Sequence, residues 1–396
     1  MANLPLKHLF DLPEGVIYLD GNSLGPLPKA VPARIQGMIT DEWGGELIRG
    51  WNTARWMEQP LRVGNKIAPL IGAAEGTVVM GDTLSIKVYQ ALAAALAMRP
   101  DRRVILSDNG NFPTDLYMAE GLIGTLGKGH RLELVEPEAA LEAITEDTAA
   151  VMLTHVDYRT GRLHDMDAIS ARAAEKGAVM IWDLAHSAGA LPVDITATGA
   201  EFAVGCSYKY LNGGPGAPAF IYVRSDIADS IQPALSGWLG HEAPFAFDLD
   251  YRPGQSIERM RVGTPPVIQM TALETALEVW EHTTIQDIRQ ASIALTEAFI
   301  QGIEAKIPEL TLASPRDPTQ RGSQVSFHFP DGYAAMQAVI ARGVIGDFRA
   351  PDIMRFGFTP LFIGQDDVES AVEIIADVIT SGIWKEDRFQ TRQAVT

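Results

Sequence analysis

Between residues 103 and 225, short apolar segments alternate with segments of helical spacing, and this alternation restricts the fold more than any other feature. The segment 164–177, HDMDAISARAAEKG, has helical spacing, ends at a glycine and separates two of the apolar segments. A strand–helix–strand order predicts right-handed crossovers and a mainly parallel sheet, and uninterrupted apolar strands indicate helices on both faces. The predicted strands are 103–108, 131–136, 149–156, 178–184, 200–207 and 219–225.

The pattern changes after about residue 285, where an α+β unit is expected. Its predicted elements are a long helix at 285–308, strands at 324–330 and 353–360, and helices at 333–343 and 366–382. A length of 396 residues exceeds one ordinary core and suggests two unequal domains. We expect three parts with a cleft between the domains: an N-terminal segment, 1–40, that packs on the domains, a large α/β domain, 41–284, and a small α+β domain, 285–396.

The charge and cysteine content exclude several classes of protein. The net charge is −18, and no basic cluster is dense enough to neutralise nucleic-acid phosphates. Cys206 is the one cysteine, so neither a disulfide framework nor a cysteine zinc site can form within the chain. The first residues lack the pattern of a secretory signal, and the apolar stretch ALAAALAM is too short to span a bilayer. We therefore expect a cytoplasmic protein with no membrane partner.

Polar residues follow the ends of the predicted strands, where ligands bind in open parallel sheets. Asp183 closes one strand, His186 follows it closely, and Lys209 comes after the next strand, in SYKYLNGG. A lysine that condenses with an aldehyde, and a carboxylate that pairs with a ring nitrogen, are what pyridoxal phosphate requires. Taken singly, Asp183 could be a helix cap, His186 a structural histidine and Lys209 a surface lysine.

Two more segments complete this hypothesis. The segment 81–98, GDTLSIKVYQALAAALAM, places small polar residues before a strong helix, whose first N–H groups can bind a phosphate. Phe112, after the strand 103–108, could cover the face of a cofactor ring. The alternative interpretations are a capping pair for Thr83 and Ser85, and core packing for Phe112. Because all these residues fall at strand ends, the combination favours a pyridoxal phosphate enzyme.

At this point the chain resembles the kynureninases, which are aminotransferase-like enzymes of fold type I in the class V branch. The resemblance runs nearly end to end, and it implies a large domain with a mainly parallel seven-stranded sheet flanked by helices and a smaller C-terminal domain. The segment GNSLG near the start makes the resemblance to the kynureninases more specific. The motifs that carry it are LDGNSLGPLP (19–28), GWNTARW (50–56), DNGNFPTD (108–115), WDLAHSAGALPVD (182–194), SYKYLNGGPGAPAFIYV (207–223), GWLGHEAPFAFD (237–248) and RVGTPPV (261–267).

The resemblance implies a role for each matching position. Lys209 would hold the cofactor aldehyde and move protons, Asp183 would hold the ring nitrogen, and Tyr208 would reach the phosphate and transfer a proton. Trp238 and Thr264 would approach the cofactor of a partner subunit, which makes a homodimer necessary. The implied cofactor contacts are Leu84, Ser85, Phe112, Asp115, Asp183, His186, Tyr208, Lys209, Trp238 and Thr264. The implied substrate contacts are Arg355, which would grip a carboxylate, Ser23 and Trp51.

The activity implied by the resemblance is hydrolysis of L-kynurenine to anthranilate and L-alanine, in tryptophan catabolism. Many relatives carry asparagine at the position of Thr264, so 3-hydroxy-L-kynurenine stays open as a second substrate. A cysteine desulfurase or selenocysteine lyase of the same fold is the main alternative, but Cys206 lies on the strand side of Lys209, where packing is expected. A transaminase is also open. The spacing of His241–Glu242 and His155–Asp157 matches no common metal site, so no metal is expected.

Overall fold

The computed structural model describes residues 6–392, and a seven-stranded sheet forms the centre of its larger part. The strand order is β4-β10-β9-β8-β7-β5-β6, in which β10 is antiparallel to both neighbours and the other pairings are parallel. The predicted mainly parallel sheet is therefore confirmed. The strands are β4 (Val78–Met80), β5 (Val104–Asp108), β6 (Arg131–Val135), β7 (Thr148–Thr154), β8 (Val179–Asp183), β9 (Phe202–Gly205) and β10 (Phe220–Val223).

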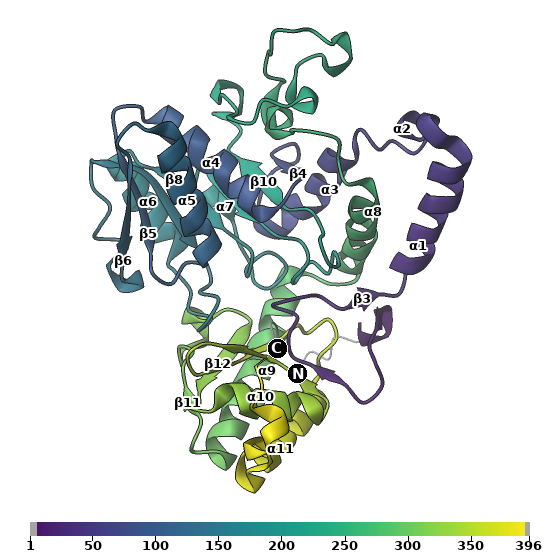
Figure 1. Ribbon diagram of the computed structural model, residues 1–396, viewed down its shortest axis with the longest axis vertical. Coiled ribbons are helices and arrows are strands. Elements are labelled where there is room, and N and C mark those ends of the chain that lie inside the picture. Colours follow the sequence, from purple (N-terminus) through teal and green to yellow (C-terminus); the bar gives the residue numbers. More distant parts are fainter. Residues whose placement is uncertain (1–5, 393–396) are drawn as a thin grey trace.

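Helices cover both faces of this sheet (Figure 1). Side chains alternate along each strand, so Met152 of β7 faces one helical layer while Val151 and Leu153 face the other. This explains why the central strands are apolar throughout, as predicted. One face carries α4 (Leu84–Met98) and α5 (Pro113–Leu126). The other face carries α3 (Gln59–Ile67), α6 (Met166–Lys176) and α8 (Val267–Ala276), with the short α7 (Ile195–Thr198) nearby.

A second sheet lies in the C-terminal part, below the first in Figure 1. It is antiparallel, with the order β11-β12-β15-β14, and the predicted strands at 324–330 and 353–360 are β12 and β15. Phe299 and its aromatic neighbours fill the core between the sheet and the helices. The elements are α9 (Ile285–Lys306), β11 (Thr311–Leu312), β12 (Gln324–His328), α10 (Gly332–Ala341), β13 (Val344–Ile345), β14 (Asp347–Arg349), β15 (Ile353–Gly357) and α11 (Gln365–Ser381).

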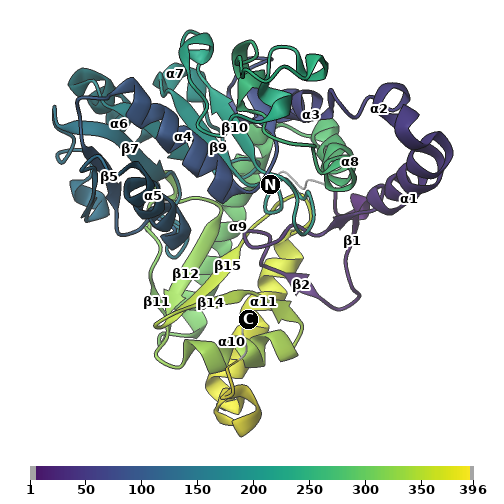
Figure 2. The same cartoon turned by 45° about the horizontal axis from the view of Figure 1, so that its top comes forward.

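The N-terminal segment touches both parts of the molecule. Phe10 and Leu19 lie in the core of the C-terminal part, and β2 (Ile17–Tyr18) pairs in parallel with β13. Further along, α1 packs against α8 of the large part, and then a π-helical stretch and α2 form an arm at the side of the molecule (Figure 2). The remaining elements are β1 (Phe10–Asp11), β3 (Leu27–Pro28), α1 (Val31–Gly37) and α2 (Gly50–Thr53). The division into domains at residues 41 and 285 remains our proposal.

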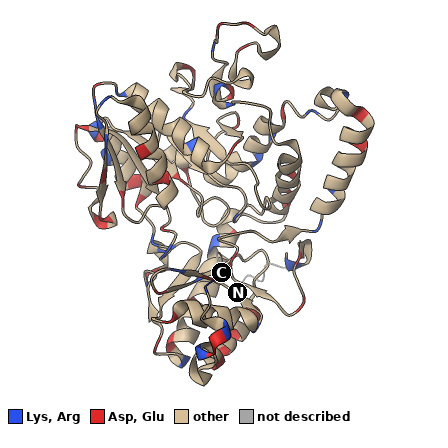
Figure 3. Cartoon of the chain, in the orientation of Figure 1, with Lys and Arg blue, Asp and Glu red and all other residues tan. Residues whose placement is uncertain are grey.

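Charged residues of both signs are spread over the two parts of the molecule in Figure 3, and Lys and Arg do not gather on one helix. The net charge of −18 is therefore not offset by a local basic cluster, and a chain of this sign repels polyanions such as nucleic acids. Among residues 6–392, no helix has the length and apolar character needed to cross a membrane.

Helix α4 contains a fully buried lysine. The Nζ atom of Lys87 donates to Gln90 Oε1 at 3.0 Å and, at 3.4 Å each, to Asp82 Oδ2 and the carbonyl oxygen of Met260. Burial lowers the pKa of Lys87 to about 8, and the nearby Asp82 opposes that shift only in part. The folded chain therefore gives up this proton more readily than the unfolded chain does.

We predict that this lysine makes stability rise with pH above about 8. Between this pKa and the ordinary value of 10.5 the unfolded chain binds more protons, so folding becomes more favourable as pH increases. Urea unfolding at pH 7.5 and pH 10 should show the wild type gaining up to a few kcal/mol relative to Lys87→Met, at about 1.4 kcal/mol per pKa unit. The control is Lys306→Met, at an exposed position of α9. A parallel pH profile for Lys87→Met and the wild type would contradict the prediction.

Candidate active site

The carboxyl ends of β8 and β9 bring Asp183, His186 and Lys209 together, as the sequence predicts for the edge of a parallel sheet. Lys209 follows β9, and its Nζ lies 3.0 Å from Nε2 of His186. Asp183 is the last residue of β8 and is only 2% exposed. Its Oδ1 atom accepts a hydrogen bond of 2.8 Å from the backbone N–H of Ala185, which fixes the direction of the carboxylate.

The electrostatics of this group are set by burial. Burial raises the pKa of Asp183, although the charge of Lys209 and the N–H of Ala185 act in the opposite direction. Burial, together with the positive charge of Lys209, holds the pKa of His186 well below its usual range. His186 is therefore a neutral imidazole at neutral pH, and it can accept a hydrogen bond from the Lys209 ammonium.

Helix α5 adds two predicted residues to the site. Asp115, in its first turn, is 1% exposed, and its Oδ2 atom has no hydrogen-bond partner among the described residues. Burial and the nearby Asp183 raise the pKa of Asp115 well above its usual value, with Lys209 opposing. Phe112 precedes the helix, is 43% exposed, and packs edge to face on Tyr158 with ring centroids 5.2 Å apart. A partly exposed ring and an unsatisfied buried carboxyl both fit a site for a planar, polar ligand.

Thr154 and Asn111 also belong to this group, although the sequence analysis did not single them out. Thr154 ends β7, and its hydroxyl lies 2.5 Å from Asn111 Oδ1 and 3.3 Å from Asp183 Oδ2. Asn111 Oδ1 also accepts from the backbone N–H of Phe112, at 2.7 Å. The Thr154 hydroxyl thus links the carboxylate of Asp183 to the turn that contains Asn111 and Phe112. The available signal was that Thr154 lies near the end of the predicted strand 149–156.

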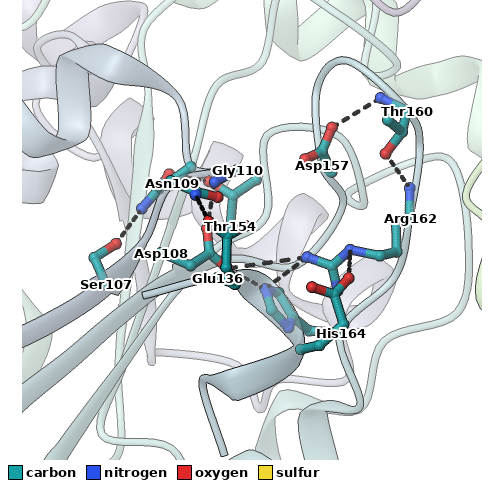
Figure 4. Close-up of polar contacts among 12 residues, drawn as sticks. Ser107, Asp108, Asn109, Gly110, Glu136, Thr154, Asp157, Thr160, Arg162 and His164 are labelled. Atoms are coloured by element: carbon teal, nitrogen blue, oxygen red, sulfur yellow. Dashed lines mark hydrogen bonds and ion pairs between the residues drawn. The ribbon is translucent and has the colours of Figure 1, made fainter. Parts of the chain in front are cut away.

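A polar network outside this group fixes the same turn (Figure 4). Asp108 Oδ2 lies 2.6 Å from His164 Nε2, and Asp108 Oδ1 accepts from the backbone N–H of Gly110 at 2.9 Å. Asn109 donates to Glu136 Oε1 at 2.7 Å. These hydrogen bonds fix the conformation of residues 108–110. The next residues, Asn111 and Phe112, are therefore fixed in position at the strand ends.

A cavity of about 360 Å³ opens beside the lysine turn and the start of α4. Thr83 is the N-cap residue of α4 but makes no side-chain capping bond, so the N–H groups of the first turn, which includes Leu84 and Ser85, have no side-chain cap. Such a turn can hold a phosphate. The cavity is lined by Ser23, Leu24, Thr83, Leu84, Cys206, Tyr208, Pro215, Gly216, Ala217 and Ala219. The donor set therefore fits pyridoxal phosphate.

The structure brings the predicted substrate residues Arg355 and Ser23 together, and it adds Asp347. Arg355, in β15, donates from Nε to Asp347 Oδ1 at 2.7 Å and from Nη2 to Ser23 Oγ at 2.7 Å. A second close contact joins Arg355 Nη2 to Asp347 Oδ2. Asp347 was missed; it lies eight residues before Arg355, in the strand β14 that pairs with β15. A fork-to-fork pair of this kind holds an arginine in one orientation.

Three predicted residues do not join this group within one chain. Trp51 lies in α2 and packs edge to face on Trp56, with centroids 5.5 Å apart. Trp238 is 41% exposed and packs on Phe245, and Thr264 is exposed in the segment before α8. Among the described residues, no hydrogen bond or ring contact links Trp238 or Thr264 to Lys209. Their predicted role in a partner's site remains a prediction.

The chain is similar over nearly its whole length to proteins of known family. The chain is 50% identical to a kynureninase of Pseudomonas fluorescens and to one of Burkholderia pseudomallei, in each case over 99% of this chain and 96% of the relative. The chain belongs to the kynureninase family. The kynureninase C-terminal domain family matches residues 288–375, and the DegT/DnrJ/EryC1/StrS aminotransferase family matches residues 123–200.

Solved structures similar to this kynureninase-family chain show the fold. The cysteine desulfurase CsdA of Escherichia coli has a TM-score of 0.80 at 19% identity, covering 96% of this chain and 99% of that one. A C-DES variant with glycine covalently linked to its PLP cofactor has a TM-score of 0.79 at 18% identity, covering 94% and 99%. The predicted pyridoxal phosphate fold type I, with its seven-stranded sheet, is thereby confirmed.

We predict that Thr154→Val weakens cofactor binding about fivefold, which corresponds to the loss of one hydrogen bond of about 1 kcal/mol. Valine removes the hydroxyl that contacts Asp183, and that hydroxyl holds the pKa of Asp183 down against the larger effect of burial. Titration of the apoprotein with pyridoxal phosphate, followed by visible absorbance, measures the dissociation constant. The matched control is Thr125→Val on α5, whose hydroxyl contacts only the carbonyl oxygen of Gly121. Equal dissociation constants for wild type and Thr154→Val would refute the role of this hydroxyl.

Proposed function

We propose that this chain is a pyridoxal-phosphate-dependent hydrolase that cleaves the β,γ carbon–carbon bond of L-kynurenine to give anthranilate and L-alanine. The observation that carries the proposal is the identity of 50% over 99% of the chain with a curated kynureninase. The grouping of Lys209, His186 and Asp183 at the strand ends supports it, because that chemistry needs a lysine and an acid at one edge of the sheet.

The cofactor in this proposal is pyridoxal phosphate, which acts as an electron sink for the carbanions formed at the substrate. Lys209 would hold its aldehyde, and Asp183 would face its ring nitrogen. The first turn of α4 and Tyr208 would hold its phosphate, since Thr83 leaves that turn without a side-chain cap and Tyr208 lines the adjacent cavity. Phe112 would cover the ring, and its exposed fraction of 43% leaves a face for that contact.

The protein's own groups would then carry the proton transfers. The Nζ of Lys209, once free, takes the proton from the substrate α-carbon, and neutral His186 at 3.0 Å can accept a hydrogen bond from the protonated amine. Asp183, with its Oδ1 held by the N–H of Ala185, presents Oδ2 as the negative charge for the ring nitrogen. The neighbouring Cys206 and burial raise the pKa of Tyr208, so its phenol keeps its proton at neutral pH and can donate it.

A cysteine desulfurase of the same fold is the second candidate, because the structural neighbours include one. Such an enzyme needs a reactive thiolate at the substrate. Cys206 is buried, and burial raises the pKa of its thiol, so a buried packing role fits it better. Release of sulfide from L-cysteine without any anthranilate from L-kynurenine would favour this candidate, and a requirement for an α-keto acid would indicate a transaminase.

The proposal includes a homodimer with a shared active site. A loop with three solvent-facing apolar residues projects from the large sheet at the top of Figure 1, in which Phe245 is 64% exposed, Phe247 75% and Leu249 103%. Exposed apolar side chains clustered beside Trp238 are typical of an interface. A partner seated there would bring Trp238 and Thr264 towards its own cofactor. A cytoplasmic location, in tryptophan catabolism and NAD biosynthesis, completes the proposal.

We expect Lys209→Ala to lose the visible absorbance band of the bound cofactor and to release no anthranilate from L-kynurenine, because the proposal makes this lysine the amine that holds the cofactor aldehyde. Anthranilate fluorescence and an absorbance spectrum of the purified variant test both points. The control is Lys176→Ala at the end of α6, whose side chain pairs with Glu146, and it should match the wild type. Turnover by Lys209→Ala at the wild-type rate would show that the lysine is misassigned.

We also expect Phe245→Ser with Phe247→Ser to raise the dimer dissociation constant by at least about tenfold, as loss of central aromatic anchors does at interfaces. Analytical ultracentrifugation over a range of protein concentrations measures this constant. Leu134→Ser in the edge strand β6, where the leucine is 47% exposed, is the control for a general loss of apolar surface. A double variant that dimerises as strongly as the wild type would remove this loop from the interface.

A further inference from the structure

The start of β12 reaches from the C-terminal part of the chain to the turns that follow β8 and β9. Ser323, just before the strand, donates from its Oγ atom to the carbonyl oxygen of Ala190 at 3.0 Å. The carbonyl oxygen of Ser323 accepts a hydrogen bond of 3.2 Å from the hydroxyl of Tyr210, whose ring packs edge to face on His186 with centroids 6.5 Å apart. Gln324, the first residue of β12, therefore lies close to the histidine of the lysine site.

The side-chain amide of Gln324 has one favourable orientation. Gln324 is 1% exposed, and its Nε2 atom donates to the carbonyl oxygens of Tyr158 at 3.1 Å and Asp157 at 3.3 Å. Turning the amide over would place Oε1 against these two carbonyl oxygens, which cannot donate. Oε1 therefore points away from them, and it is buried without a hydrogen-bond partner among the described residues.

His186 has a ring nitrogen with the complementary requirement. Its Nε2 atom lies 3.0 Å from the Nζ of Lys209, and an ammonium can only donate, so Nε2 accepts and the proton of the neutral imidazole is on Nδ1. His186 is 4% exposed, and within residues 6–392 its Nδ1 atom also lacks a hydrogen-bond partner. A buried N–H without an acceptor is unfavourable, so this proton needs an oxygen or nitrogen nearby.

The Oε1 atom of Gln324 is the acceptor that matches this N–H. A side-chain hydrogen bond from Gln324 opposes the effect of burial on the pKa of His186, which is the direction expected when a carbonyl oxygen faces an imidazole N–H. The contact is looser than a regular hydrogen bond, because neither atom reaches a partner at normal geometry. Its location agrees with the contacts of Ser323 and Tyr210, which bring the two segments together independently of any charge.

We propose that Gln324 is a positioning residue of the lysine site, whose Oε1 atom accepts the hydrogen bond from Nδ1–H of His186 and so keeps Nε2 as the acceptor that faces Lys209. Its effect on turnover rests on the proposed function, in which His186 accepts a hydrogen bond from the lysine ammonium. A residue of the C-terminal part would then orient a group at the end of the large sheet. The competing interpretation is that Gln324 only ties the turn at Asp157 and Tyr158 to β12.

Nuclear magnetic resonance of the full chain, with and without added pyridoxal phosphate, tests the hydrogen bond. The chain has eight histidines, so ¹⁵N labelling of their rings gives few signals, and those of His186 are the signals lost in His186→Asn. The variants are Gln324→Met, which removes the acceptor, and Gln324→Glu, which keeps an acceptor oxygen. The matched control is Gln59→Met on α3, a buried glutamine whose Oε1 also lacks a partner and whose Nε2 donates to Thr271.

We expect the wild type to carry the His186 ring proton on Nδ1, with a proton signal shifted downfield by its hydrogen bond. Gln324→Met should shift that signal upfield or move part of the population to the form protonated on Nε2, because the acceptor is gone. Gln324→Glu and Gln59→Met should keep the proton on Nδ1. An unchanged His186 spectrum in Gln324→Met overturns the proposal. A wild type with its His186 proton on Nε2 also overturns it, whether or not the variants fold.

A kinetic measurement tests the positioning role. We expect Gln324→Met to lower kcat for anthranilate release about fivefold, which corresponds to the loss of one hydrogen bond. KM should be nearly unchanged, because Gln324 does not line the cavity beside the lysine turn. Gln59→Met should match the wild type in both constants. A changed His186 spectrum with an unchanged kcat would show that the hydrogen bond exists without positioning the site, and would overturn this role.

The two measurements separate this inference from the proposed function. If the wild type releases no anthranilate from L-kynurenine but Gln324→Met changes the His186 spectrum, the substrate assignment is wrong and the hydrogen bond holds. If the wild type releases anthranilate and Gln324→Met keeps the wild-type spectrum, the function holds and this inference is wrong.

Discussion

The interaction on which the site depends is the electrostatic effect of Lys209 on two buried carboxyls. Asp183 and Asp115 are each almost fully buried, and the charge of Lys209 opposes the pKa increase of both. Carboxylates buried without a cation become protonated, so an acid that must stay charged at a ring nitrogen needs this partner. The parallel sheet supplies the arrangement, because the ends of neighbouring strands meet along one edge.

A second pair of opposite charges, Asp347 and Arg355, lies where the proposed function places the substrate. Asp347 and Arg355 are both nearly inaccessible to solvent, and Ser23 bridges them from the N-terminal segment. The segment that begins in the core of the C-terminal part thus continues to the cavity beside Lys209, where Ser23 and Leu24 line the wall. A buried ion pair contributes little net stability, but it fixes geometry strongly when every donor is used. In the proposed function, substrate recognition would therefore be built from three segments far apart in the chain.

Most strands of the large sheet could be predicted from the pattern of apolar residues. Several candidate site residues could be predicted from their position at the ends of those strands. Six strands of the large sheet lie where apolar segments predicted them, because a strand covered on both faces must be apolar throughout. The strand β4 was not predicted, since three residues are too few to show any period. Lys209 and Asp183 were predicted because they lie at the ends of strands. Thr154 and Asp347 were missed, since a threonine or an aspartate near a turn has many ordinary roles.

The sequence by itself determined the layered α/β architecture, the family, and the lysine and carboxylate at the strand ends, because these depend on local pattern and on strand order. Only the tertiary structure decided which donors are free. Arg349 and Arg355 are six residues apart in one hairpin and look equivalent in sequence. Packing leaves Arg355 enclosed by Asp347, Ser23 and the carbonyl of Tyr158, and leaves Arg349 with an unused Nε. The partners that satisfy a hydrogen-bond donor come from remote segments, and no local pattern records them.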